Sequence, residues 1–271
     1  MLIQRIISTL LWVVILWLVI FVFPVWVFML AITFLIAIAL KEFYNMAKEK
    51  GFSSHAYMGI VAGCILPWIS CISTTRIFSD MEFLLLLVVS LVVFILQIFK
   101  RKTENALLSI ATTIFGIFYI AWLASFIVKI RFLQLDGADG RFLVLYLLIV
   151  TKSSDVGAYL VGTFFGKHPM IPHVSPKKSV EGTIAGFIVS FSAAIIFGAM
   201  LPFMGIIKLA LLGIILGLLS QLGDWSESVL KRDCKIKDSG KVFPGFGGIL
   251  DIVDSLLFAI PVFYFYIVFF G

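Results

Sequence analysis

The chain has 271 residues, of which 62% are hydrophobic and only 13% are charged, and its net charge is +6. A soluble globular domain needs more polar material than this to cover its core, so the composition excludes that class. The low charge also argues against an outer-membrane β-barrel, whose strands alternate polar and apolar residues. In a membrane protein, basic residues are typical of cytoplasmic loops beside anionic lipid, so the charge does not indicate a nucleic-acid partner.

Long apolar runs recur along the whole chain. A helix of about 20 apolar residues crosses the hydrocarbon layer and satisfies its own backbone hydrogen bonds. No small-residue cleavage site follows the first run, which indicates a retained span rather than a secretion signal. The first two runs are separated by little more than Pro24, so whether they form one helix or two is left open. We predict nine spans, at about 6–23, 25–40, 57–73, 81–99, 106–128, 142–165, 182–201, 205–222 and 250–270.

The distribution of lysine and arginine tests this topology. With nine spans, 15 of the 21 basic residues fall on one side of the membrane and 5 on the other, while Lys152 lies inside a span. The excess marks the cytoplasmic side, so we predict a cytoplasmic N-terminus and place the loops at 166–181 and 223–249 on the cytoplasmic face. Fusing the first two spans moves only Arg5 across, so charge alone does not exclude eight spans.

These patterns predict an all-α polytopic bundle in the inner (plasma) membrane, formed by one membrane domain over residues 1–271. Residues 1–150 are interpreted as anchoring and packing helices, and residues 151–271 as the region that carries the chemistry. Two polar stretches of the first part are interpreted as structural. Lys41-Glu42-Phe43-Tyr44 is typical of a solvated helix end with an aromatic belt, and Asp136–Arg141 of a polar turn.

The first unusual polar stretch is Thr151–Asp155, inside an apolar run. A charge at the centre of a bilayer costs about 2.5–3.5 kcal/mol on insertion scales, so such residues usually pair or line a cavity. Lys152 and Asp155 are three residues apart and share a helix face, so they either neutralise each other or serve a site. Glycines at 157, 162 and 166 predict close helix packing.

The second is the loop from His168 to Gly182. It contains Ser175, Lys177, Lys178 and Ser179, and lysines flanked by hydroxyls suit phosphate oxygens. Ser179 is also placed to cap the next helix, whose first amides attract anions. The alternative is an ordinary basic loop on the cytoplasmic side.

The third stretch is residues 223–255, where Asp224 ends one predicted span and Asp251 and Asp254 open the next. The last two are three residues apart, so their carboxylates project from one helical face. Five cations and a Pro-Gly-Phe-Gly-Gly turn lie between the two spans, and glycine lets backbone approach a ligand closely. Mg²⁺ is typically held by one or two carboxylates plus substrate phosphates, so the pattern predicts a magnesium–nucleotide site.

At these positions the chain resembles the phosphatidate cytidylyltransferase (CDP-diacylglycerol synthase) family. The blocks around Asp155 to Lys167 and Ser175 to Gly182 are also similar to blocks of that family. Two positions depart from the family pattern, because Phe246 stands where histidine is usual and Ile252 where arginine is usual. The residues in register with the family signature are Ser228, Lys231, Arg232, Lys237, Asp238, Gly240, Pro244, Gly245, Gly247, Gly248, Asp251, Asp254 and Ser255.

The resemblance implies that a phosphate oxygen of phosphatidic acid attacks the α-phosphorus of CTP and releases pyrophosphate, with Mg²⁺ as cofactor in a two-metal arrangement. It also implies a homodimer. Metal ligands are expected among Asp224, Asp251 and Asp254, with Asp224 and Asp251 as the principal ones, and catalysis at Asp224, Asp251, Lys231 and Arg232. Substrate contacts are expected from Asp155, Ser175, Lys177, Lys178, Ser179, Lys237, Asp238, Gly247 and Gly248.

Two rival functions stay open. A related CTP-dependent enzyme on another lipid, such as a polyprenol or phytol kinase or an ether-lipid cytidylyltransferase, would use the same nucleotide. A kinase would release CDP instead of pyrophosphate, so product analysis separates it. An ion-coupled transporter would also place acids inside the membrane, but it predicts charges spread through a central cavity rather than gathered in the second half of the chain.

Overall fold

The computed structural model describes residues 13–72, 80–100, 104–135, 138–202, 204–240 and 247–271. Two short antiparallel hairpins pair β1 (Gln134–Leu135) with β2 (Ala138–Asp139) and β3 (Pro169–Ile171) with β4 (Ser175–Ser179). Almost all of the remaining elements are helices. They are η1 (Leu18–Val22), α2 (Val25–Glu49), α3 (Ala56–Ile72), α4 (Met81–Ile98), α5 (Ala106–Gly116), η3 (Ile117–Trp122), α6 (Leu123–Phe132), α7 (Gly140–Phe165), α8 (Val180–Ile196), η4 (Phe197–Met200), α9 (Ile206–Asp233), α10 (Leu250–Leu257) and α11 (Ala259–Phe270).

The all-α polytopic class predicted from composition is confirmed. Over the described ranges, seven helical segments are long and apolar enough to cross a membrane, and the other two predicted spans correspond to the shorter apolar helices Val13–Val22 and Ala56–Ile72. Residues 6–12 of the first predicted span lie outside the described part. The first two spans are separate helices, because the backbone at Phe23 and Pro24 is extended, and proline has no amide hydrogen to continue the helix.

Two predicted boundaries were wrong. The span predicted to end at 222 continues to Asp233, so the loop expected from 223 begins only after that residue. The extension persists because it has an inward face, on which Glu227, Ser228 and Lys231 are buried, while Val229 faces outward. The last predicted span consists of two helices, α10 and α11, that meet at Phe258.

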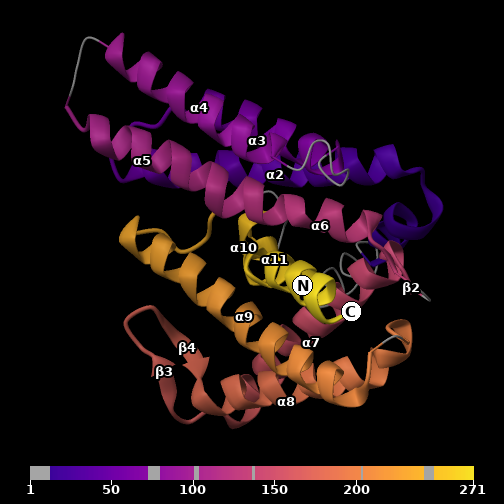
Figure 1. Cartoon of the computed structure of the whole chain (residues 1–271). Coiled ribbons are helices and arrows are strands. Elements are labelled where there is room, and N and C mark those ends of the chain that lie inside the picture. Colours follow the sequence, from indigo (N-terminus) through magenta and orange to yellow (C-terminus); the bar gives the residue numbers. More distant parts are fainter. Residues whose placement is uncertain (1–12, 73–79, 101–103, 136–137, 203, 241–246) are drawn as a thin grey trace.

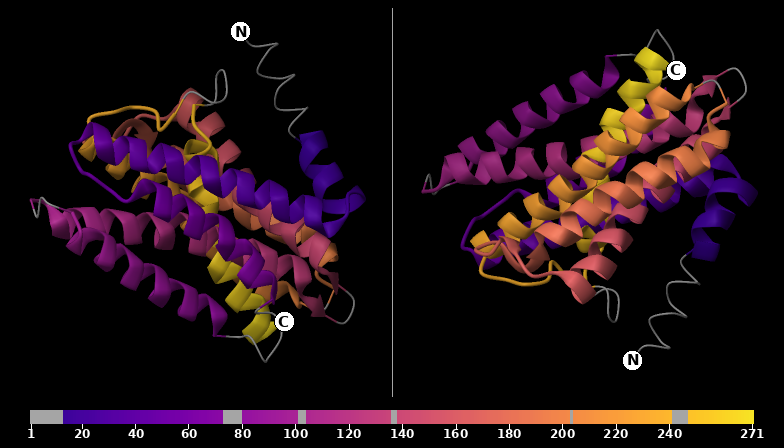
Figure 2. Two further views of the ribbon diagram at one scale, coloured as in Figure 1. Left: turned by 90° about the horizontal axis from the view of Figure 1, so that it is seen from above. Right: turned by 90° about the horizontal axis from the view of Figure 1, so that it is seen from below.

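The helices form two layers with a helix pair between them (Figure 1). Helices α2 to α6 make one layer and α7 to α9 the other, and α10 and α11 run between them. Views from above and below show α11 passing between the two layers toward the C-terminus (Figure 2). The short α10 thus lies where both halves of the chain reach it, and its residues belong to both hydrophobic cores.

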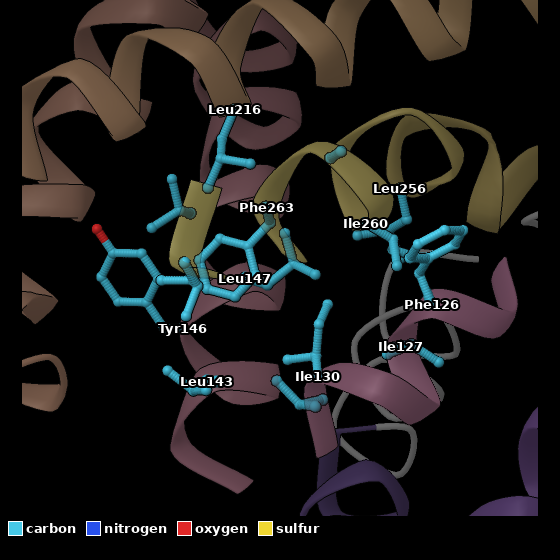
Figure 3. Close-up of a cluster of buried hydrophobic side chains, with 14 of the residues drawn as sticks. Phe126, Ile127, Ile130, Leu143, Tyr146, Leu147, Leu216, Leu256, Ile260 and Phe263 are labelled. Carbon is cyan, nitrogen blue, oxygen red and sulfur yellow. The ribbon is translucent and has the colours of Figure 1, made fainter. Parts of the chain in front are cut away.

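The first core joins α6, α7, α9 and α11 (Figure 3). Ile130, Tyr146, Leu216 and Phe263 are all fully buried there. The second core joins α2, α3, α4 and η3 to α10, and contains Leu250 at the start of α10. Large apolar side chains also cover the outside of the bundle, which suits a surface in contact with lipid.

Close packing of α7 against α8 was predicted from glycines, and the structure confirms it. A Cβ atom at Gly157 would lie 2.8 Å from Val189, and one at Gly182 would lie 2.7 Å from the backbone oxygen of Ala158. Small residues allow helix backbones to approach in this way. The approach brings the end of α7 and the start of α8 together beside β4.

Candidate active site at one end of the bundle

The two segments predicted to share one face of the membrane meet at one end of the bundle. Arg232 Nε, near the end of α9, donates to the Val174 carbonyl oxygen beside β4 at 2.9 Å. Lys178 Nζ of β4 lies 2.7 Å from Asp224 Oδ2 of α9. The prediction that these segments lie at the same end is therefore confirmed for the residues the structure describes.

The predicted loop at 166–181 contains a hairpin rather than irregular chain. β4 carries Ser175, Lys177, Lys178 and Ser179 and leads directly into α8. Ser179 Oγ accepts a hydrogen bond from the Gly182 amide at 3.2 Å, which confirms the predicted cap. The hairpin holds the two lysines at the N-terminal end of a helix, where the exposed amides favour anions.

A cavity of about 180 Å³ lies between α7, β4, α8 and α9. Ligand pockets usually measure about 300–1,000 Å³, so this cavity suits part of a nucleotide, such as its phosphates, rather than the whole. The structure brings five of the predicted site residues together here. The residues that line it are Asp155, Ala158, Tyr159, Gly162, Thr163, Lys177, Lys178, Ser179, Gly182, Thr183, Gln221, Asp224 and Trp225.

The intramembrane pair on α7 is part of a network that reaches two other helices. Lys152 Nζ lies 3.1 Å from Asp155 Oδ2, so the two charges do pair. Lys152 also donates to the Ile252 carbonyl oxygen at 2.8 Å and to Ser255 Oγ at 2.7 Å. Asp155 accepts from Ser255 Oγ at 2.9 Å and from Ser220 Oγ at 2.8 Å. Pairing and lining a cavity are therefore compatible roles for Asp155.

Asp254 completes a group of three acids on three helices. It is buried on α10 and interacts electrostatically with Asp224, Asp155 and Lys152. Helix α9 reaches it closely, since a Cβ atom at Gly223 would lie only 2.2 Å from the Asp254 carbonyl oxygen. We call Lys152, Asp155, Lys178, Asp224 and Asp254 the pocket cluster.

A second polar group lies further along α9. Lys231 Nζ contacts Glu227 Oε2 at 2.5 Å and Asp251 Oδ1 at 2.6 Å. Asp251 Oδ2 accepts from the Ser239 amide at 3.1 Å, Ser239 Oγ at 2.9 Å and the Gly248 amide at 2.7 Å. Both oxygens of Asp251 are thus occupied by donors. We call Glu227, Lys231, Ser239 and Asp251 the Lys231 cluster.

Sequence reasoning missed Glu227 and misread Glu42. Glu227 is fully buried and lies four residues before Lys231, a spacing that indicates a pair once 223–233 is helical. Glu42 was interpreted as part of a solvated helix end, but it is 5% exposed and accepts hydrogen bonds from the amides of Ile249 at 3.1 Å and Leu250 at 2.8 Å. The signal for this was an acid placed among apolar neighbours.

The remaining predicted residues lie around these clusters. Arg232 is exposed and holds two backbone oxygens, of Val174 and of Ile236. Lys237 and Asp238 are exposed in the segment that follows α9. Gly247 has φ +90°, a conformation that favours glycine. Of the two departures from the family pattern, Ile252 is half-buried on α10 and Phe246 lies outside the described residues.

The oxygen donors of the pocket cluster are chemically suited to Mg²⁺. Magnesium prefers carboxylates and phosphates, and three carboxylates from α7, α9 and α10 gather here beside two lysines. Among the residues described, no three acidic, histidine or cysteine side chains are close enough to hold a metal as they stand. Substrate phosphates would therefore have to supply further ligands, as is usual for this ion.

The bundle and its clustered charges define an integral membrane protein with a polar site at one end of its helices. Nucleotide-transferring enzymes provide the match in sequence, since the profile of the cytidylyltransferase family fits residues 3–270. The chain belongs to the cytidylyltransferase family, whose members are nucleotidyltransferases.

Three relatives match over most of their length. A phosphatidate cytidylyltransferase of Bacillus subtilis is 34% identical over 245 residues, which cover 87% of this chain and 86% of the relative. One of Synechocystis is 31% identical over 290 residues, covering 98% and 96%. The uncharacterized protein YnbB of Escherichia coli is 33% identical over 231 residues, covering 85% and 75%.

Proposed function

We propose that this protein is a phosphatidate cytidylyltransferase, which converts CTP and phosphatidic acid into CDP-diacylglycerol and pyrophosphate. The observation that carries the proposal is the pocket in which Lys177 and Lys178 of β4 face Asp224 of α9. The relatives that bear this name and match nearly the whole chain support the choice of substrates.

The proposed reaction needs charge neutralisation and alignment more than acid–base chemistry. A phosphate oxygen of phosphatidic acid is already an anion, and it forms a bond to the α-phosphorus of CTP. The bond from that phosphorus to the oxygen bridging to the β-phosphate breaks, and the electron pair leaves with pyrophosphate. Lys177 and Lys178, at the start of α8, would draw the phosphates of CTP into the pocket and offset the repulsion between the two anions.

The proposed ligands of Mg²⁺ are Asp224, Asp254 and Asp251, with Asp155 beside them. When bound, magnesium would neutralise phosphate charge and hold the two substrates in line. Asp224 and Asp254 already lie together, whereas Asp251 would have to exchange its contact with Lys231 for the metal. The pairing of Asp224 with Lys178 would likewise give way, so that Lys178 turns to the phosphates of CTP.

The proposed location is the inner membrane, with the site opening to the cytoplasm. The acyl chains of phosphatidic acid would stay in the bilayer beside the apolar outer surface of the helices, and CTP would arrive from the side of the basic loops. A homodimer remains a prediction from the family resemblance.

The test is a reaction with the purified protein in lipid nanodiscs, with CTP labelled at its α-phosphate, Mg²⁺ and phosphatidic acid. We expect labelled CDP-diacylglycerol and an equal amount of pyrophosphate. Parallel reactions with an ether-linked phosphatidic acid, a polyprenol and phytol test the rival enzymes. Release of CDP from an alcohol substrate, without CDP-lipid from phosphatidic acid, would replace the proposal with a lipid kinase.

A further inference from the structure

A side chain from the first half of the chain holds the start of α10. Glu42 on α2 accepts hydrogen bonds from the amides of Ile249 and Leu250, across more than 200 residues of sequence. The helix provides no cap of its own here, because the side chain of Ile249 cannot accept a hydrogen bond. The Glu42 carboxylate therefore serves as the N-terminal cap of α10 from a different helix.

Glu42 and Asp251 hold the same short segment from two sides. Ser239 Oγ lies 2.9 Å from Asp251 Oδ2 and 3.4 Å from Glu42 Oε2. The Gly248 amide donates to Asp251, and the next two amides along the chain donate to Glu42. Because Asp251 in turn contacts Lys231, the position of Glu42 is transmitted to a pair of predicted site residues.

The chain around Glu42 leaves no space for a larger residue. A Cβ atom at Gly240 would lie 2.2 Å from Glu42 Oε1, and its three nearest atoms all belong to the Glu42 side chain. Gly240 is not among the residues with positive φ, so space rather than backbone conformation requires glycine there. This gives a physical reason for one glycine of the family signature.

The charge of Glu42 depends on the same contacts. A buried carboxylate is costly unless hydrogen bonds satisfy it, and amides at a helix N-terminus stabilise negative charge. Among the described residues, each recorded donor to Glu42 comes from the segment 239–250. The acid and the start of α10 therefore stabilise each other, and neither is properly placed without the other.

We infer that Glu42 is a positioning residue of the active site, which fixes the N-terminus of α10 and thereby holds Asp251 against Lys231. The inference rests on the proposed function for its kinetic readout. Glu42 does not line the described pocket and is assigned no contact with substrate.

The first experiment compares Glu42→Ala, Glu42→Gln and Glu49→Ala. Glu49 is the matched control, since it is an exposed acid on the same helix. We expect Glu42→Ala to lower kcat by about 100-fold through misplacement of the site. Glutamine keeps the length and one acceptor oxygen, so Glu42→Gln should recover about tenfold of that loss. Glu49→Ala should stay within about twofold of the parent protein.

Hydrogen exchange gives a readout that does not need activity. In nanodiscs, peptides covering Ile249 and Leu250 should exchange about tenfold faster in Glu42→Ala, because the amides lose their acceptor. The exchange of peptides from α8 should be unchanged. If the parent protein made no CDP-lipid but this exchange result held, the proposed function would fail while the cap assigned to Glu42 would stand.

The second experiment is a double-mutant cycle with Gly240→Ala. We expect Gly240→Ala alone to reduce kcat by about tenfold or more, because the new methyl group displaces the Glu42 carboxylate. In the Glu42→Ala background the same change should cost about twofold or less, since the clashing atoms are gone. Additive effects, or a Glu42→Gln variant as impaired as Glu42→Ala with unchanged exchange at 249–250, would overturn the inference.

Discussion

The two polar clusters on α9 are satisfied in different ways. In the pocket cluster, Lys178 and Asp224 form one contact in a cavity, and their side chains are 24% and 39% exposed. In the Lys231 cluster, the side chains of Lys231 and Asp251 are 11% and 12% exposed, and Asp251 accepts four hydrogen bonds or ion contacts. The open cluster can exchange its partners for substrate, whereas the closed cluster holds backbone and helices in place.

This difference separates two kinds of mutational effect. Substitutions in the pocket cluster should reduce turnover and leave folding intact, since few internal contacts are lost. Substitutions in the Lys231 cluster should reduce stability, because they leave buried charges without partners. The following changes test this separation, from the largest expected effect to the smallest.

The largest effect is expected for Asp224→Asn in the pocket cluster. Loss of this charge beside the phosphates should lower kcat/KM for CDP-diacylglycerol formation by on the order of 10³-fold, or about 4 kcal/mol. Asp233→Asn, on the same helix but outside the pocket, serves as control and should remain active. Full activity of a folded Asp224→Asn protein would remove Asp224 from the site.

Lys231→Met should act chiefly on stability. It leaves the carboxylates of Glu227 and Asp251 buried without their cation, which should reduce the free energy of unfolding by about 3 kcal/mol. Thermal unfolding in detergent, followed by tryptophan fluorescence, measures the change. Adding Glu227→Gln removes one of the unpaired charges and should restore part of the loss. An unchanged melting temperature in Lys231→Met would contradict the assignment of this cluster to structure.

Lys178→Met should weaken CTP binding while leaving the melting temperature almost unchanged. A charge-assisted contact to phosphate is worth about 1.5–3 kcal/mol, so KM for CTP should rise about 10- to 100-fold. Lys167→Met is the control, because Lys167 is exposed outside the pocket. Equal effects of both substitutions would indicate a general electrostatic attraction instead of a specific contact.

Removal of magnesium should produce the smallest change in stability. Saturating EDTA should abolish product formation, and Mg²⁺ should restore it. At ten times its dissociation constant, Mg²⁺ should stabilise the folded protein by about 1.4 kcal/mol, which raises the melting temperature. Asp224→Asn should lose this shift. A shift that survives in Asp224→Asn but disappears in Asp251→Asn would move the metal toward the Lys231 cluster.

Most of the architecture could be predicted from sequence because it follows from solvent. Apolar runs of sufficient length must be helical in a membrane, and all nine predicted spans correspond to apolar helices over the described ranges. The boundary at 222 failed because the hydropathy signal ends where Asp224 begins the polar stretch, although the helix continues to Asp233. Hydropathy reports the depth of the membrane and says little about where a helix ends in protein.

Much of the site could also be predicted, since charged residues in apolar surroundings are costly and therefore conspicuous. Lys152, Asp155, Lys178 and Asp224 were all found in this way, and the structure brings them together. Ser220 gave no comparable signal, because a hydroxyl inside a membrane helix can bond to its own backbone at little cost.

The sequence by itself determined the membrane-spanning helical class, the family and the acids and lysines of the site, because each depends on local composition or on fixed spacing. Only the tertiary structure decided which partner each charge has. Glu42 meets Ile249 and Leu250 because α2 packs beside α10, and no local pattern encodes a contact between segments so far apart. Such pairings arise when the two layers close on α10, and they divide similar charged residues into an open cluster and a closed one.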